Sequence, residues 1–186
     1  MRSYIERAQD FITEILPIIG NEMDPWTLES IMDKFNRDNH RRVLVRSGSA
    51  RVAFITSDYV VKFDYDEEEV EEIGGCENEI YLWQLAQAEG FSHLFAEITR
   101  IEIKGRNFYI MPRIYGIGTG HGLGWGYMTE SEKNWCQNHS LTDLHRSNYG
   151  FRKGHICIVD YAFQEDNVCE ASSYYYYEHE SEVSEN

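Results

Sequence analysis

Positive charge, paired cysteines and long apolar runs are all scarce in this sequence of 186 residues. It contains 17 Lys and Arg against 32 Asp and Glu, which gives a formal net charge of -15. Because nucleic acids and anionic membrane surfaces would repel so acidic a chain, we expect neither as a partner. No apolar run approaches the roughly 20 residues of a membrane span. Acidic residues interrupt the apolar pattern of the N-terminus, which therefore does not resemble a signal peptide.

The four cysteines are scattered, without a C-x-x-C pair. This spacing argues against a zinc site or a disulfide scaffold and favours a reducing compartment, so we expect a cytoplasmic protein. What is present is a globular composition, with 42% hydrophobic and 14% aromatic residues, in a length that favours one domain with ample core. The cysteines are Cys76, Cys136, Cys157 and Cys169.

The first half of the chain combines helical and strand patterns. Apolar residues at helical spacing predict a helix at about 4–19, and Asp24 followed by Pro25 starts a second one. Later, a helix is predicted over about 76–89, ended by Gly90. Alternating apolar residues predict strands at about 42–46, 50–55 and 59–64, and a hairpin within 97–112 that turns at Lys104-Gly105-Arg106.

The second half begins with glycine at alternate positions from 116 to 126, a pattern typical of a loop. Thr129 and Glu132 form a capping box that opens a helix of about 130–138. A polar loop follows, and then a second hairpin that turns at Lys153-Gly154.

This order of elements predicts an α+β fold, in which a five-stranded antiparallel sheet is flanked by a helix. We divide the chain into an N-terminal helical extension over 1–41, a main domain over 42–163, and a tail over 164–186. The tail is acidic and rich in tyrosine, and its few apolar residues predict that it is flexible.

Lys62 stands in the middle of the apolar strand pattern YVVKF. A lysine there either faces a polar site or protects an exposed sheet edge against aggregation. Glu77 and Glu79 follow in the next predicted helix, and a helical glutamate is able to reach Lys62 and fix its position. We favour Glu79 as this partner, because it lies just ahead of the apolar run. The alternative for Glu79 is an ordinary solvated helix residue.

The stretch RSGSAR, residues 46–51, occupies a predicted turn between two strands. Gly48 and the small Ser49 would let backbone N–H groups approach phosphates. Arg51 belongs to a local cluster of arginines in an otherwise acidic chain, and an anionic nucleotide needs positive charge there. The alternative is an ordinary hairpin turn.

The stretch DLHRSN places Asp143 and Asn148 five residues apart in a tight loop. A carboxylate orients or accepts a hydroxyl proton, and an amide oxygen is a hard ligand suited to Mg²⁺. Asp160 ends an apolar strand, where a carboxylate is costly unless it meets a metal or another partner. Because one hairpin separates Asn148 from Asp160, both should return to the same end and form a Mg²⁺ site. The alternative is a capped turn beside a strand-terminal Asp.

Together, LTDLHRSNYG and ICIVDY, with VVKF and NEIYLW upstream, resemble the protein-kinase-like superfamily. The resemblance is to its compact atypical members: aminoglycoside and choline phosphotransferase relatives, and small phage-encoded or bacterial-effector kinases. It covers about 42–163 and implies a minimal two-lobed fold. The N-lobe, about 42–112, would hold the five-stranded sheet, and the C-lobe, about 113–163, would be truncated.

The resemblance also implies cofactors and roles. ATP and Mg²⁺ would be the cofactors, as in phosphoryl transfer by related proteins. The glycine loop would be 46–51, with Gly48, Ser49 and Arg51 at the nucleotide. The implied roles are Asp143 as catalytic base, Lys62 as the α/β-phosphate lysine, Glu79 as its helix partner, Asn148 and Asp160 as Mg²⁺ ligands, and Met111 and Arg113 beside the adenine.

The chain departs from the family pattern in several places. Leu141 stands where the family often has His, and only Gly48 remains of the three loop glycines. The Asp-Phe-Gly triplet is Asp160-Tyr161-Ala162, and no Ala-Pro-Glu follows it. The nucleotide site is therefore nearly complete in the sequence, whereas the usual peptide-docking machinery is missing.

Three functions fit these observations. The first is a Mg²⁺- and ATP-dependent kinase that acts on Ser or Thr of a protein. The second is a catalytically weak, kinase-like binding module whose acidic surface engages and regulates a basic host or partner protein. A small-molecule phosphotransferase is third, because its relatives usually build the acceptor pocket from a larger second lobe. We therefore expect a protein substrate or a regulated protein partner.

Overall fold

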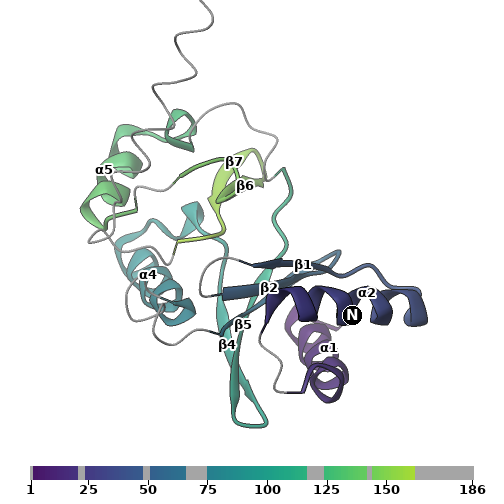
Figure 1. The fold of residues 1–186 in the computed structure, drawn as a ribbon. Helices are drawn as coiled ribbons and strands as arrows, with labels where there is room; N and C mark the ends of the chain where they lie inside the picture. Colours follow the sequence, from purple (N-terminus) through teal and green to yellow (C-terminus); the bar gives the residue numbers. More distant parts are fainter. Residues whose placement is uncertain are drawn as a thin grey trace, which may run out of the picture.

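The computed structural model describes residues 2–20, 24–47, 51–65, 75–116, 124–141 and 144–161 (Figure 1). The tail 164–186, Gly48, Ser49, Asp143 and most of the glycine-alternating segment lie outside the described residues, so what was predicted for them stays a prediction.

Two helices precede the sheet: α1 over Tyr4–Ile19 and α2 over Pro25–Asn39. A capping box between Ser3 and Glu6 starts α1. Asp24 accepts a hydrogen bond from the backbone N–H of Thr27 and so caps α2. Both predicted helices, and the predicted start at Asp24-Pro25, are confirmed.

A five-stranded sheet follows, with every neighbouring pair antiparallel. Its order is β1-β2-β3-β5-β4, so β3 is the middle strand. The predicted α+β class with a five-stranded antiparallel sheet is confirmed. The strands are β1 (Leu44–Ser47), β2 (Arg51–Ile55), β3 (Tyr59–Asp64), β4 (Thr99–Ile103) and β5 (Arg106–Pro112).

The two faces of this sheet bury different side chains. On one face, Phe54, Val61 and Phe108 share an apolar core with α1 and α2. The two helices lie together beside the strands, and α4 (Cys76–Glu89) lies apart from them across the sheet (Figure 1). Because strand side chains alternate, Lys62 points to the face opposite Val61, toward α4.

The second half of the described chain forms a smaller unit. Its two-stranded sheet is the second predicted hairpin, which turns at Lys153-Gly154 with φ of 54° and 83°. The capping box of Thr129 with Glu132 starts a helix at the predicted residue. Its elements are η2 (Gly124–Tyr127), α5 (Glu130–Asn138), β6 (Tyr149–Arg152) and β7 (His155–Ile158), and η1 (Ser92–Leu94), which precedes β4 in the chain, contacts β7.

A second apolar core holds this unit together and includes α4. The Phe95 ring contacts Trp135 and Tyr161, with centroids 5.5 and 5.0 Å away. Backbone hydrogen bonds tie the β6–β7 hairpin to the rest of the chain: Ala96 N–H donates to the Ile158 carbonyl at 2.9 Å, and Phe151 N–H to the Tyr115 carbonyl at 3.0 Å. These bonds fix where the end of β7 meets the large sheet. Within the described ranges, no helix has the length and apolar character needed to cross a membrane.

Candidate active site

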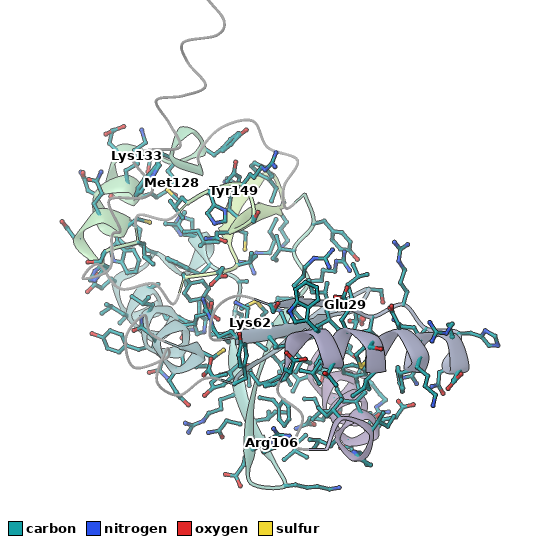
Figure 2. All side chains as sticks on the ribbon, in the orientation of Figure 1. Glu29, Lys62, Arg106, Met128, Lys133 and Tyr149 are labelled. Carbon is teal, nitrogen blue, oxygen red and sulfur yellow. The ribbon has the colours of Figure 1, made fainter. Side chains whose placement is uncertain are left out.

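A buried ion pair joins the large sheet to α4. Lys62 Nζ lies 2.8 and 3.0 Å from the two carboxylate oxygens of Glu79. Lys62 is 8% exposed and Glu79 is fully buried. Since β3 is the middle strand, Lys62 does not guard a sheet edge, and Glu79 is not a solvated helix residue. Lys62 lies in the middle of the molecule, away from Arg106 at the end of the β4–β5 hairpin (Figure 2).

The position of Glu79 follows from how α4 begins. The N-cap residue, Gly75, has no side chain to cap the helix. Instead, both carboxylate oxygens of Asp64, the last residue of β3, accept from Cys76 N–H at 3.2 Å. This contact anchors the first turn of α4 at the end of the strand that carries Lys62. Glu79 lies in that first turn, where the helix dipole favours an acidic side chain.

Glu77 and Glu79 lie on different faces of α4, and this decides which of them pairs with Lys62. Glu79 points inward to Lys62. Glu77 is 53% exposed and accepts hydrogen bonds from Arg100 at 2.6 Å and from the Tyr109 hydroxyl at 2.9 Å. The structure therefore contains the Lys62–Glu79 pair that the sequence analysis favours, and it gives Glu77 a separate partner set at the surface.

The Lys62–Glu79 pair also holds the segment that leaves β7. Lys62 Nζ donates to the Val159 carbonyl at 2.8 Å. Tyr161 N–H donates to Glu79 Oε1 at 3.2 Å, and the Tyr161 hydroxyl donates to the Ala96 carbonyl at 2.8 Å. Asp160 is therefore fixed on both sides by contacts that its neighbours make with one buried ion pair.

Arg51, the first residue of β2, closes the cluster. Its guanidinium lies 3.0 Å from Asp160 Oδ1 and 3.3 Å from Glu79 Oε1. The Arg51 side chain is 19% exposed, whereas that of Asp160 is 40% exposed. We call these four residues, Arg51, Lys62, Glu79 and Asp160, the charge cluster. It contains two cations and two carboxylates, one of which faces solvent.

The surroundings favour the ionised forms of Lys62 and Asp160 in the charge cluster. Burial by itself would lower the pKa of Lys62, but the carboxylates of Glu79 and Asp160 outweigh it and raise that pKa. Burial would raise the pKa of Asp160, but Lys62 and Arg51 outweigh it and hold that pKa below its ordinary value. For Glu79 burial prevails, so its pKa is raised although Lys62 opposes the shift. Lys62 thus offers a firm positive charge and Asp160 a firm negative one.

Asn148 and Asp160 lie at the same end of the β6–β7 hairpin. Tyr149 pairs with Ile158 in the register, and Val159 N–H donates to the Asn148 carbonyl at 2.8 Å. Asn148 is 9% exposed and immediately precedes β6. The hairpin therefore brings the two predicted Mg²⁺ ligands to one end, as the sequence analysis expects from their spacing.

These residues fit a hard divalent cation by their chemistry, since carboxylate and amide oxygens are its usual protein ligands. The exposed fraction of Asp160 leaves its carboxylate accessible from solvent. Within the described ranges there is no group of three or more His, Cys, Asp and Glu side chains that would hold a metal ion by itself.

The predicted catalytic loop is described on both sides of residues 142–143 but not at Asp143 itself. Leu141 and Leu144 are 3% and 2% exposed and belong to the second apolar core. The Leu144 carbonyl accepts from Gly124 N–H at 2.9 Å. Leu141 is therefore a core residue that helps to anchor this loop.

Met111 and Arg113 have protein neighbours. Met111 is 1% exposed, within β5, and belongs to the second apolar core. Arg113 donates from its guanidinium to the Thr56 carbonyl and from its backbone to the Asp58 carbonyl, and it stacks on Tyr115. Its side chain is thus engaged with the β2–β3 turn. Contact of either residue with adenine stays a prediction.

Sequence reasoning missed three features of this site: the cap that Asp64 provides to α4, the Val159 carbonyl on Lys62, and the bridge from Arg51 to two carboxylates. The cap from Asp64 could have been found in the sequence, because an Asp at the end of a strand precedes a helix whose own N-cap residue is glycine. The other two join residues far apart in sequence, and no local pattern indicates them.

No known protein-family model matches this chain, and no curated protein matches it. Among solved structures, the chain is similar to the choline kinase LicA from Streptococcus pneumoniae. The sequence identity is 14%, the match covers 73% of this chain and 69% of that chain, and the TM-score is 0.36. A likeness at this level carries no argument about function, which has to come from the residues themselves.

Proposed function

We propose that this chain is a Mg²⁺- and ATP-dependent phosphotransferase with a minimal two-lobed, protein-kinase-like fold, and that it acts as a small serine/threonine protein kinase. The observation that carries the proposal is the buried Lys62–Glu79 pair, bonded directly to both neighbours of Asp160. The same few contacts join a fixed cation, its carboxylate partner and a solvent-accessible carboxylate.

Each group has a task in phosphoryl transfer, which needs positioning and charge neutralisation more than covalent chemistry. Lys62, held charged by Glu79, would bind the α- and β-phosphates. Asn148 and Asp160 would hold Mg²⁺, which neutralises charge on the phosphates. Asp143 would orient the attacking hydroxyl. In this proposal the two apolar cores are two lobes, and the charge cluster lies where they meet.

Transfer of label from γ-labelled ATP, to the protein itself or to a basic protein rich in Ser and Thr, tests the activity. We expect Lys62→Met and Asp143→Asn to lower transfer at least a hundredfold. Lys133→Met is the matched control, because Lys133 pairs with Glu130 on the surface of α5. If both site variants transfer as much label as the wild type, the proposal is wrong.

Binding gives a second test that does not depend on finding the acceptor. A ligand that binds the native state must stabilise it. Mg²⁺ with a non-hydrolysable ATP analogue should raise the melting temperature of the wild type, and Asp160→Ala should abolish most of this shift. An unchanged melting temperature of the wild type would remove the nucleotide from the proposal.

The net charge favours a second candidate, an acidic binding module that engages a basic protein. The charge cluster is balanced, so it does not account for a formal charge of -15. Such a surface would speed association with a basic partner and make it sensitive to salt. Salt-dependent capture of a basic protein, without any effect of nucleotide on melting temperature, would favour this candidate over the kinase.

A further inference from the structure

Arg51 makes the least expected contacts in the candidate active site. Its guanidinium forms ion pairs with two carboxylates from different parts of the fold, Asp160 after β7 and Glu79 on α4. One of these oxygens, Asp160 Oδ1, belongs to the carboxylate that the proposed function gives to Mg²⁺. The guanidinium therefore occupies one side of a metal-ligand group.

The charges of the cluster cancel as the structure stands. Arg51 and Lys62 contribute two positive charges, and Glu79 and Asp160 contribute two negative ones. A divalent cation on Asp160 would add two positive charges beside two cations already present. Repulsion between like charges is strong at partly buried positions, where solvent screens them weakly.

We propose that Arg51 is an internal counter-ion of Asp160, which keeps a divalent cation off this carboxylate until a polyphosphate binds. The polyphosphate supplies the negative charge that lets the cation and Arg51 coexist, and the fork of the guanidinium matches phosphate oxygens. The inference rests on the proposed function and adds to it a residue that makes cation and nucleotide binding depend on each other.

The dependence has a measurable form. If the polyphosphate raises the affinity for the cation, the cation raises the affinity for the polyphosphate by the same factor. Arg51 sets that factor, because it penalises the cation alone and attracts the anion. Replacing Arg51 by an uncharged side chain of similar length should therefore strengthen binding of the cation alone and weaken the coupling.

Water-proton relaxation enhancement measures this directly, since it reports Mn²⁺ bound to the protein without any turnover. Mn²⁺ would be titrated alone, with inorganic tripolyphosphate and with a non-hydrolysable ATP analogue. We expect Arg51→Met to bind Mn²⁺ alone at least fivefold more tightly than the wild type. A gain of less than fivefold overturns the inference.

Three further variants separate charge from other effects. Arg51→Lys keeps the positive charge and should exclude Mn²⁺ as the wild type does. Arg100→Met is the matched control. It removes an arginine that pairs with Glu77, which lies on α4 as Glu79 does, and it should leave Mn²⁺ affinity unchanged. The double variant Arg51→Met with Asp160→Asn should lose the gain. A gain that survives in this double variant places the cation elsewhere and overturns the inference.

Failure of this inference is distinguishable from failure of the proposed function. If tripolyphosphate strengthens Mn²⁺ binding and the ATP analogue does not, the counter-ion role stands and the ATP-dependent activity is wrong. If the ATP analogue strengthens Mn²⁺ binding equally in the wild type and in Arg51→Met, nucleotide binding stands and the counter-ion role is wrong. Circular dichroism and a melting curve for each variant show that the fold is retained.

Discussion

The two faces of the five-stranded sheet are formed by the same strands but bury different kinds of side chain. The face toward α1 and α2 buries aromatic and aliphatic side chains, among them Phe54, Val61 and Phe108. The face toward α4 carries Arg51 and Lys62 and receives Glu79 from that helix in the charge cluster. The first face is an apolar core. The second contains a charge network that stays partly open to solvent at Asp160.

The difference arises from the period of two along a strand. In β3, Val61 and Phe63 point to the apolar core and Lys62 between them points to the charge cluster. A shift of one residue in strand register would exchange these environments and bury the lysine among aromatic rings. The apolar face therefore fixes the register on which the charged face depends, and the two faces should respond differently to substitution.

The largest effect on stability should come from the apolar face. Phe54 is fully buried, and its ring lies 6.0 Å from that of Phe11 and 5.6 Å from that of Phe63. Phe54→Ala should lower the free energy of unfolding by about 4 kcal/mol, because it leaves a cavity among these rings. Urea denaturation measures the loss. A cost below about 1.5 kcal/mol would mean that the core closes over the gap.

On the charged face, Lys62→Met should lower the free energy of unfolding by about 3 kcal/mol, because it leaves the buried Glu79 without its nearest cation. The variant Lys62→Met with Glu79→Gln should be more stable than Lys62→Met alone, since it removes the uncompensated charge. Chemical denaturation of both, beside Lys133→Met, makes the comparison. Equal stability of the single and double variants would show that Glu79 does not depend on Lys62.

A smaller effect should follow from the loss of one buried hydroxyl. Tyr161→Phe removes the bond to the Ala96 carbonyl and should cost about 1.5 kcal/mol, because that carbonyl is left without this donor in a buried place. Tyr115→Phe is the matched control: its hydroxyl also donates to a backbone carbonyl, that of Ser57, but the side chain is 62% exposed. Similar costs for the two variants, in denaturation curves, would contradict the role of burial.

The smallest expected effect is a loss of stability at high pH, caused by Tyr59 in the core of the apolar face. Burial, aided by Asp58, raises the pKa of Tyr59 to about 12. The ordinary value is about 10, so the unfolded chain ionises first and stability is lost as pH rises from about 10 to the folded value. At pH 10.5 this difference in the pKa of Tyr59 should have lowered the free energy of unfolding by about 1 kcal/mol. Tyr59→Phe should therefore lose less stability than the wild type between pH 9 and 10.5, measured by urea denaturation at each pH. An equally steep loss in both proteins would contradict this assignment.

Local signals in the sequence predicted most of the fold. The capping box of Thr129 and Glu132 marks the start of α5, and Asp24 with Pro25 marks that of α2. The Lys-Gly turns of both hairpins are found where predicted, with positive φ at Lys104 and Lys153. Each of these signals involves only a few neighbouring residues, so it can be recognised without knowing how the rest of the chain folds.

The candidate site was predicted in part. The spacing of Asn148 and Asp160 predicted their return to one end of a hairpin, because a hairpin is itself local. The helical position of Glu79 favoured it over Glu77 as the partner of Lys62, and the structure has that pair. The Arg113 guanidinium donates to the Thr56 carbonyl in the turn between β2 and β3, and its contact with adenine stays a prediction. The catalytic role of Asp143 stays a prediction.

The sequence by itself determined where helices, strands and turns begin and end, since caps, turn residues and apolar periodicity act over short distances. Only the tertiary structure decided which charges meet. Lys62 and the Val159 carbonyl are 97 residues apart, and Arg51 and Asp160, which form an ion pair, are farther apart still in the sequence. Such contacts depend on the order of strands in the sheet and on how the β6–β7 hairpin docks against it, and no pattern within a short window of sequence contains that information.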